Sequence, residues 1–267
     1  MIESNIAIIG GGNLGIALAE GFLKSANIPA SRLTVTRRKI QLLQALKDKG
    51  VTVHSDNVQA VKHADWIILA IKPKQILDVL KEIAPYLRDD KHLLISVATG
   101  VSISELEAIA GSQIPLFRAM PNTAAAIGES MTCISTKNGT PQQQQQVIHL
   151  FEQIGRAIVI EEELMSAATV LAACGIAYSL RYIRAASQGG IEIGFDAATA
   201  QLIAAQTVKG AASLLIERGE HPEREIDRVT TPQGCTIAGI NEMEHQGFSS
   251  SLIKGIMTSY KTIEKLH

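Results

Sequence analysis

The sequence predicts an α/β fold, with an N-terminal doubly wound parallel sheet over residues 1–161 and an all-helical domain over residues 162–267. Two observations lead to this prediction. Up to about residue 160, short and nearly continuous apolar runs alternate with amphipathic runs, which is typical of parallel strands covered by helices on both faces. From residue 161 onward the strand pattern ends, and longer helical patterns follow it.

The individual elements follow from hydrophobic periodicity and from the positions of glycine and proline. The apolar runs expected to form strands are 5–9, 33–36, 51–54, 66–71, 92–97, 116–120, 130–135 and 157–160. Helices are expected between them at 13–25, 39–49, 57–62, 75–87, 104–111 and 141–154. In the second domain they are expected at 163–188, 197–218, 234–246 and 249–265, with breaks at Gly189-Gly190 and Gly194, at 219–222, around Pro232 and at Gly247.

Composition narrows the class of protein. The 267 residues are 46% hydrophobic and 19% charged, with a formal net charge of −1. That balance gives no long-range electrostatic reason to expect nucleic acid or an anionic membrane as a partner. The three cysteines are widely spaced, and the chain begins without a basic signal region, so we expect reduced thiols in a cytoplasmic protein. No spacing of histidine, cysteine and carboxylate residues predicts a metal site.

One uncharged stretch, residues 164–180, needs to be weighed as a membrane span. It is shorter than the roughly 20 residues that a span requires and contains Ser, Thr, Gly, Cys and Tyr. We therefore expect a buried helix and no membrane partner.

A glycine-rich segment follows the first predicted strand directly. Gly10, Gly12 and Gly15, with Asn13 and Leu14 between the last two, match the G-x-G-x-x-G spacing and open a predicted helix. In the Rossmann fold the first glycine permits a tight turn, the second allows the main chain to approach a pyrophosphate, and the third allows close packing of helix and strand. Free N–H groups at the helix start then face the anion. The strand–loop–helix context favours a dinucleotide site over a glycine-rich turn without a ligand.

The end of the second predicted strand distinguishes between the two nicotinamide cofactors. A site selective for NAD places a carboxylate there, about 20 residues after the loop, to bind the ribose hydroxyls. This chain instead has Arg37, Arg38 and Lys39 after Thr36. Guanidinium groups match the extra 2′-phosphate of NADP in a bidentate manner, so NADPH is preferred and NADH remains possible. The alternative is a solvated basic turn.

Further motifs, in order along the chain, are Ala70-Ile71-Lys72-Pro73, then 118–123 (RAMPNT), then 229–237 (VTTPQGCTI), with His221-Pro222 before the last. Together with the glycine loop they resemble the pyrroline-5-carboxylate reductase family from about residue 5 onward. The resemblance implies reduction of a cyclic C=N bond by hydride from NAD(P)H to give proline, the last step of proline biosynthesis. It also implies helical domains that interlock into a homodimer, or into a higher oligomer of dimers.

The resemblance assigns roles to residues at the matching positions. Asn57 would lie near the adenosine ribose, Ala70, Lys72 and Pro73 would contact the cofactor, and Met120 and Asn122 would lie beside the nicotinamide. The carboxylate of the substrate would be held by Thr231, Gln233, Gly234, Cys235 and Thr236, and that segment would come from the partner subunit. Thr236 is the candidate catalytic residue.

A physical argument agrees with this substrate segment. Pro232 suits the first turn of a helix, and the amides of Gln233 to Thr236 would then face a small anion. The family usually has glycine where this chain has Gln233. If only backbone amides contact the substrate, a glutamine with ordinary helical φ and ψ would be tolerated, whereas affinity would fall if the glycine makes room for the ring. Cys235 stands where the family usually has Thr or Ala, and the reaction needs no nucleophile, which would in any case require an activating base. The proton for the imine nitrogen comes either from solution before binding or from Thr236 with a water molecule, and the residues do not distinguish these routes.

Other functions remain open at this stage. The β-hydroxyacid dehydrogenases share the layout but carry a catalytic lysine on the first long helix of the second domain, and residues 161–194 contain no lysine. A reductase of another small cyclic imine, or a non-catalytic dimer that senses NADPH, would also be compatible with the cofactor loop. The second of these gives no reason for the 232–236 segment.

Overall fold

The computed structural model describes residues 2–265, so Met1, Leu266 and His267, at the outer ends of the two predicted domains, lie outside the described residues. The chain forms two compact units. One consists of the chain up to Cys174 together with the segment from Tyr260 onward, and the other is Gly175–Ser259. The sequence-based boundary at residue 161 falls at the end of the sheet, immediately before the helix that leads from the first unit into the second.

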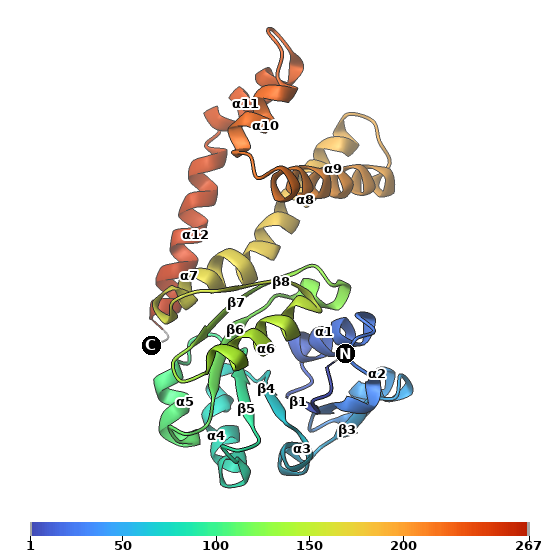
Figure 1. The fold of residues 1–267 in the computed structure, drawn as a ribbon. Coiled ribbons are helices and arrows are strands. Elements are labelled where there is room, and N and C mark those ends of the chain that lie inside the picture. Colours follow the sequence, from blue (N-terminus) through green and yellow to red (C-terminus); the bar gives the residue numbers. More distant parts are fainter. Residues whose placement is uncertain (1, 266–267) are drawn as a thin grey trace. The chain divides into compact units, whose positions relative to one another are not determined.

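The first unit is built on one sheet, in which the strands lie in the order β3-β2-β1-β4-β5-β6-β7-β8 (Figure 1). The predicted doubly wound α/β fold is confirmed, because the strand order reverses direction at β1 and β4, beside the glycine loop. The strands are β1 (Ile6–Ile9), β2 (Leu33–Thr36), β3 (Thr52–His54), β4 (Trp66–Leu69), β5 (Leu93–Ser96), β6 (Leu116–Met120), β7 (Ser130–Thr136) and β8 (Gly155–Val159).

The sheet is not entirely parallel. β7 runs antiparallel to β6, with Arg118 opposite Ser135 and Met120 opposite Cys133. Only residues 121–129 join the two strands, and they form the short 3-10 helix η4 (Thr123–Ile127). A parallel crossover needs a dozen or more residues, so this connection can only return the chain antiparallel. β8 then pairs with β7 in the parallel direction after a helical crossover.

Helices cover both faces of the sheet, and each face has its own apolar core. Alternate residues of β1 supply them: Ile6 and Ile8 belong to one cluster, and Ala7 and Ile9 to the other. The α-helices of this unit are α1 (Asn13–Lys24), α2 (Gln44–Asp48), α3 (Asn57–His63), α4 (Pro73–Ile83), α5 (Ile103–Ala110) and α6 (Pro141–Glu152). The helix predicted at 39–49 is in fact a 3-10 turn, η2 (Ile40–Leu43), followed by the short α2. Two other 3-10 turns are η1 (Ala30–Arg32) and η3 (Ala84–Tyr86).

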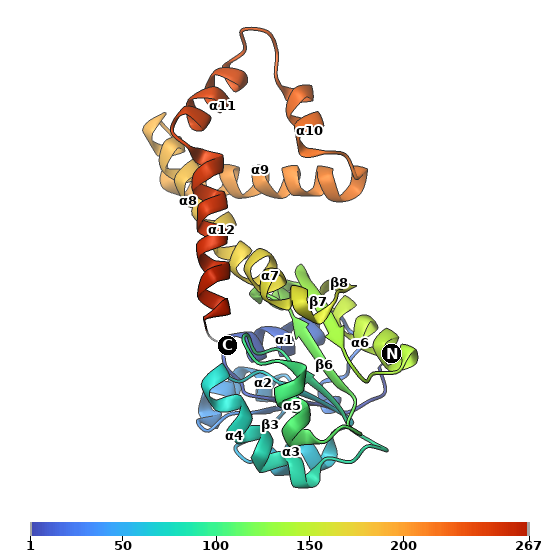
Figure 2. The same ribbon diagram turned by 90° about the vertical axis from the view of Figure 1, so that its left-hand side faces the viewer.

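A long, locally irregular helical segment connects the sheet to the second unit. It consists of η5 (Glu162–Leu164), α7 (Met165–Ala168), the π-helical η6 (Thr169–Cys174) and α8 (Gly175–Glu192). The predicted break at Gly189-Gly190 is wrong, because α8 continues through both glycines. Gly190 serves packing instead of ending the helix: a Cβ there would lie 3.0 Å from the Cβ of Ala200, so glycine allows α8 and α9 to approach closely (Figure 2).

The remaining helices of the second unit are α9 (Ala197–Arg218), α10 (Pro222–Val229), α11 (Cys235–His245) and α12 (Phe248–Glu264), the last of which extends into the first unit. Helix α10 was not predicted. It begins with Pro222 at its first position, and the side chain of His221 accepts a hydrogen bond from the amide of Glu223 at 3.3 Å.

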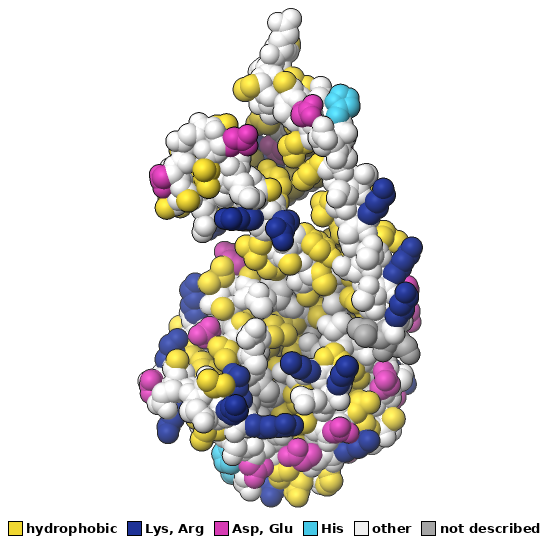
Figure 3. All heavy atoms as spheres, turned by 180° about the vertical axis from the view of Figure 1, so that it is seen from behind, with side chains coloured by type: hydrophobic (Ala, Val, Ile, Leu, Met, Phe, Trp, Pro, Cys, Tyr) yellow, Lys and Arg dark blue, Asp and Glu magenta, His cyan; other side chains and the backbone are white. Residues whose placement is uncertain are grey.

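The helical segment Glu162–Glu192 is long and apolar enough, by length and composition, to cross a membrane, but only 17% of its apolar window is buried in the chain. The expectation that residues 164–180 form a helix buried within this chain is therefore wrong. Other apolar side chains of the second unit are also open to the surface, including Ile193 at 78% and Leu202 at 70% exposure (Figure 3). The apolar character of these helices is thus not explained by packing within one chain.

Candidate active site

The glycine loop has the geometry that its sequence predicts. It joins β1 to α1, and Gly10 adopts φ +109°, where a Cβ would lie 2.5 Å from the carbonyl oxygen of Ala70. A Cβ on Gly15 would lie 2.1 Å from the carbonyl oxygen of Gly10, so only glycine permits this contact between helix and loop. A Cβ on Gly12 would meet no atom within 4 Å. Gly12 is also the N-cap of α1 and has no side chain to occupy the first-turn amides, so open space and free donors coincide.

The basic residues after β2 differ in their surroundings. Arg37 is half-buried, and its guanidinium Nη1 donates to the carbonyl of Gly11 at 2.7 Å. Arg38 and Lys39 are exposed. Arg37 is therefore fixed against the glycine loop, and the two cations after it are not held within the fold. A cation beside a phosphate-binding loop is the arrangement expected for a site that takes an additional phosphate.

Asn57 is brought to the same edge of the sheet at the start of α3. Its Oδ1 accepts from the hydroxyl of Thr36 at 2.7 Å, and the same hydroxyl accepts from the amide of Gly10 at 3.3 Å. The Nδ2 of Asn57 faces the carboxylate of Glu82, at 3.3 Å from Oε2. Sequence reasoning missed Thr36 and Glu82. Thr36 could have been predicted, because it directly precedes the arginines that were assigned to the site. No local pattern in the sequence connects Glu82 in α4 with the glycine loop.

The segment after β4 lies against the glycine loop. The amide of Ala70 donates to the carbonyl of Ile9 at 2.8 Å, and the carbonyl of Ala70 is the atom that requires glycine at position 10. Lys72 is the N-cap of α4 and Pro73 its first residue, and both are exposed. Helix α4 therefore begins at the carboxyl edge of the sheet, as α1 does at the end of the adjacent strand.

The turn after β6 is buried. Met120 is 2% exposed and Asn122 6%. The side chain of Asn122 accepts from the amide of Ala124 at 3.0 Å and donates to the carbonyl of Ala172 at 3.2 Å, while its own amide donates to the hydroxyl of Ser130 at 3.0 Å. Asn122 thus uses both ends of its carboxamide within the protein.

The predicted substrate residues lie in the second unit, in the turn between α10 and α11 and at the start of α11. Thr231, Gln233, Cys235 and Thr236 are exposed, and Gly234 is half-buried. Gly234 is the N-cap of α11, and the first intrahelical bond runs from the amide of Ala238 to its carbonyl. The amides of residues 235–237 therefore precede the hydrogen-bond ladder of the helix and point out of its N-terminus.

Two expectations about this segment are wrong. Pro232 is not in the first turn of the helix, which begins at Cys235, and Gln233 does not have helical φ and ψ but φ +58°. The amide of Gly234 donates to the carbonyl of Thr231 at 2.9 Å. Proline at the second position and positive φ at the third are the features of a type II turn, in which the third position favours glycine. The amide of Gly234 is consumed by this turn, so the donors shift to Cys235, Thr236 and Ile237.

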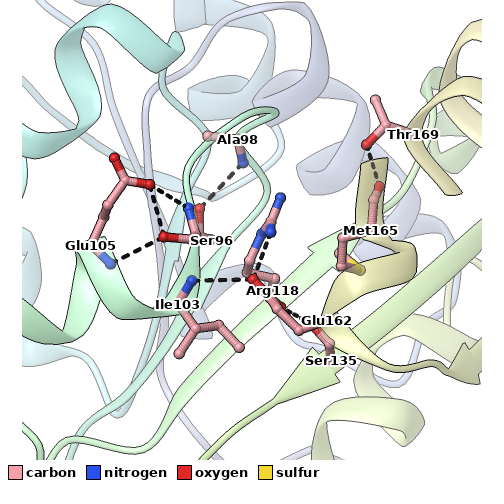
Figure 4. A network of polar contacts seen from close by, with 10 residues as sticks. Ser96, Ala98, Ile103, Glu105, Arg118, Ser135, Glu162, Met165 and Thr169 are labelled. Atoms are coloured by element: carbon pink, nitrogen blue, oxygen red, sulfur yellow. Dashed lines mark hydrogen bonds and ion pairs between the residues drawn. The ribbon is translucent and has the colours of Figure 1, made fainter. Parts of the chain in front are cut away.

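A polar cluster behind the β6–β7 pair was not anticipated. Arg118 is buried in β6, and its Nη1 pairs with the Oε1 of Glu162 at 2.7 Å; among the described residues no partner reaches its Nε. Glu162 also accepts from the hydroxyl of Ser135 at 2.5 Å and from the amide of Ile103 at 3.2 Å (Figure 4). One carboxylate at the start of the long helical segment thereby joins β6, β7 and the start of α5.

The structure therefore divides the predicted residues into two groups. The predicted cofactor residues lie in the first unit, where the carboxyl ends of β1, β2 and β4 are adjacent and β6 ends at the same edge, while the predicted substrate residues lie in the second unit. Within residues 2–265 no group of three or more His, Cys, Asp or Glu side chains is placed to hold a metal ion.

Comparison with known proteins identifies the family. Residues 162–266 match the family described as pyrroline-5-carboxylate reductase dimerisation, and residues 5–100 match the family described as NADP oxidoreductase coenzyme F420-dependent. The chain is 43% identical to pyrroline-5-carboxylate reductase 2 of Dictyostelium discoideum, covering 98% of this chain and 93% of the relative. It is also 43% identical to reductase 1 of that organism, but spans only 49% of that longer relative.

The fold comparison agrees with the sequence comparison. A crystal structure of Plasmodium falciparum pyrroline carboxylate reductase with NADP bound superposes with a TM-score of 0.90, at 26% identity, over 100% of this chain and 99% of that chain. The dimerisation family, the relatives and this fold all name the same reductase. The chain belongs to the pyrroline-5-carboxylate reductase family.

Proposed function

We propose that this protein reduces 1-pyrroline-5-carboxylate to L-proline with NADPH. The observation that carries the proposal is family membership along the whole chain, with relatives named for this activity at 43% identity. The geometry of the glycine loop and of the α10–α11 turn, which we assign to the cofactor and to the substrate, supports the proposal.

The residues of the first unit fit an NADP(H) molecule. The space above Gly12, the free amides at the start of α1 and the tight contacts of Gly10 and Gly15 form a cradle for a pyrophosphate. Arg37, with Arg38 beside it, would hold the 2′-phosphate, and Asn57 would lie at the adenosine ribose. Arg37 has a second task, because its bond to the Gly11 carbonyl fixes the loop itself.

The 231–236 segment would bind the carboxylate of the substrate. A small anion at the start of α11 meets the amides of Cys235, Thr236 and Ile237 and the positive end of the helix dipole. The type II turn holds Thr231 and Gly234 together, and a Cβ on Gly234 would lie 2.5 Å from the Thr231 hydroxyl. The turn is therefore a rigid support for the helix start.

When bound, NADPH supplies a hydride, and reduction of the C=N bond takes up one hydride and one proton to give the ring amine of proline. The hydroxyl of Thr236 both donates and accepts hydrogen bonds, so it suits a role at the ring nitrogen, where it would orient the substrate and hold the proton. The residues around the two sites otherwise orient the reactants and exclude water.

We further propose that a second copy of the chain covers the exposed helices of the second unit and provides its own 231–236 segment to the cofactor domain of the first. The match of residues 162–266 to a dimerisation family supports this, as does the apolar surface left open in one chain. A groove of about 940 Å³ between α8, α9, α11 and α12, lined mostly by apolar surface, gives a second chain a place to pack. A cytoplasmic location fits the three cysteines, all within the described residues and all unpaired.

The decisive experiment mixes the purified protein with NADPH and 1-pyrroline-5-carboxylate and follows the absorbance of NADPH. We expect substrate-dependent oxidation, with slower turnover of the six-membered cyclic imino acid used as a control. Preference for the six-membered ring would favour a reductase of another cyclic imine. NADPH binding without any oxidation would favour the non-catalytic dimer and end the proposal.

A further inference from the structure

Asn122 occupies a place where a cofactor ligand was expected, yet its hydrogen bonds are made within the protein. Its Oδ1 caps η4 by accepting from Ala124, and its Nδ2 donates to the carbonyl of Ala172. Its main-chain amide is bonded to Ser130. At 6% exposure the residue has little surface left to offer a ligand.

The acceptor of that bond lies in an unusual piece of helix. Ala172 belongs to η6, where the chain is π-helical, and the hydroxyl of Thr169 at its start donates back to the carbonyl of Met165 at 2.8 Å. π-helical turns are rare and costly, and they recur at functional sites. η6 ends at Cys174, the last residue of the first unit before Gly175 opens the second. The bond therefore ties the turn after β6 to the last helical turn before the chain enters the second unit.

We infer that Asn122 is a positioning residue, which holds the Met120–Pro121 turn in place for hydride transfer by clamping it to η6, rather than a ligand of the cofactor. The inference rests on the proposed function for the role of the turn beside the nicotinamide. Alignment of reacting atoms is sensitive to displacements of about 1 Å, which cost about 100-fold in rate. Cofactor affinity, in contrast, is set largely by the glycine loop and Arg37, which Asn122 does not contact.

The chain provides a matched control at the opposite end of the same strand. Asn138 accepts from the amide of Leu116 at 2.9 Å and donates to the carbonyls of Ile114 at 2.8 Å and Ser112 at 3.1 Å. Like Asn122 it uses its carboxamide to bind backbone next to β6, but it lies at the end of the strand away from the turn. N122D and N138D both keep the acceptor oxygen and lose the donor, so the two variants differ chiefly in location.

The test compares wild type, N122D, N122A and N138D as full-length proteins, by thermal unfolding, NADPH titration, turnover and hydrogen exchange. For N122D and N122A we expect kcat to fall by about 10–100-fold while the Kd for NADPH changes by less than about threefold. Exchange of the amides in and just after η6 should accelerate in both variants without cofactor. N138D should lose thermal stability but retain its kcat.

Each other outcome overturns the inference. A loss of NADPH affinity in step with kcat would make Asn122 a direct ligand, and a loss of stability alone, as in N138D, would make it a structural residue. Unchanged exchange at η6 would show that there is no clamp. If wild type itself fails to oxidise NADPH with substrate, the proposed function falls, while the exchange measurement still decides whether Asn122 holds η6.

Discussion

Substitution of Gly12 and Gly15 by alanine separates the roles of these two glycines, and Gly12 is the informative position. Its φ of −82° and ψ of −168° suit any residue, and an added Cβ would meet no atom within 4 Å. The folded protein therefore has room for the methyl group of G12A. The same group would stand in the space from which a pyrophosphate approaches the start of α1.

The expected magnitudes follow from these contacts. Alanine is a poorer N-cap than glycine, so G12A should lower the free energy of unfolding by only about 0.5–1 kcal/mol. A methyl group forced against a tightly packed partner costs about 1–3 kcal/mol. Applied to the bound cofactor, that cost raises the Kd for NADPH by about 5–150-fold. G15A is the contrasting case, because its Cβ would lie 2.1 Å from the Gly10 carbonyl in the protein itself.

The assay combines urea unfolding with titration of NADPH fluorescence for both variants. G12A should separate the two measurements, with near-normal stability and weak binding, whereas G15A should lose stability first. Normal NADPH affinity in a well-folded G12A protein would refute the assignment of Gly12 to the pyrophosphate. If G12A proved as unstable as G15A, the space above Gly12 would not be open.

Three other predictions concern separate parts of the chain. Arg37→Ala should weaken the binding of NADPH more than that of NADH by about 1.5–3 kcal/mol, the value of a charge-assisted hydrogen bond. Fluorescence titration should show a smaller effect for Arg38→Ala. Equal losses of affinity for the two cofactors would contradict the assignment of Arg37 to the 2′-phosphate. Gln233→Gly should raise the free energy of unfolding by up to about 1 kcal/mol, because the left-handed backbone conformation costs residues other than glycine about 1–2 kcal/mol. Gln233→Ala is the control and should show no gain. Both variants are compared by urea unfolding at a fixed chain concentration. Burial, with a contribution from nearby Lys91, lowers the pKa of His92 below its usual 6.5, so the unfolded chain takes up the proton first and stability falls as pH drops below 6.5. Asparagine at position 92 keeps an acceptor for the amide of Arg88. Unfolding of His92→Asn at pH 7.5 and at pH 5.5 should therefore show a smaller loss of stability than wild type. An identical loss would show that groups other than His92 cause the pH dependence.

The parallel strands were predictable because burial on both faces leaves an apolar run with little room for alternatives. β1 illustrates this, since all four of its residues are buried and they divide between two cores. The direction of β7 was not visible in its composition, which is the same for parallel and antiparallel pairing. It followed from the length of the connection after Met120, a signal that was present in the sequence but not used. Helix α10 was missed because only Ile226 and Val229 in it are aliphatic, although Pro222 and two glutamates mark its start.

The substrate segment shows a different limit. Its glutamine suggested helical backbone, because a residue other than glycine is rarely found at positive φ. The turn between Thr231 and Gly234 nevertheless closes with a hydrogen bond, and Pro232 fixes the second position, so Gln233 takes the left-handed conformation. Glycine would adopt this backbone conformation without strain, which gives the family's usual glycine at this position a physical reason. Local preference thus gave the wrong answer where the closing hydrogen bond and the proline outweigh one strained residue.

The exposed helices of the second unit show a further property that local sequence patterns leave undetermined, namely what covers their apolar faces. Hydrophobic periodicity predicts that the apolar face of a helix is buried, but it does not indicate whether the same chain or a second chain buries it. Within one chain the first unit buries the apolar faces of its sheet in two cores, whereas Ile193 and Leu202 of the second unit remain at least 70% exposed. Large apolar side chains left exposed in this way support the proposed interface with a second chain. The 231–236 segment lies in the same unit as Ile193 and Leu202, so association of two chains through these helices would determine where the substrate site forms. Dilution of the proposed dimer should therefore reduce turnover before it reduces NADPH binding. Simultaneous loss of both would mean that the cofactor domain also depends on the second chain.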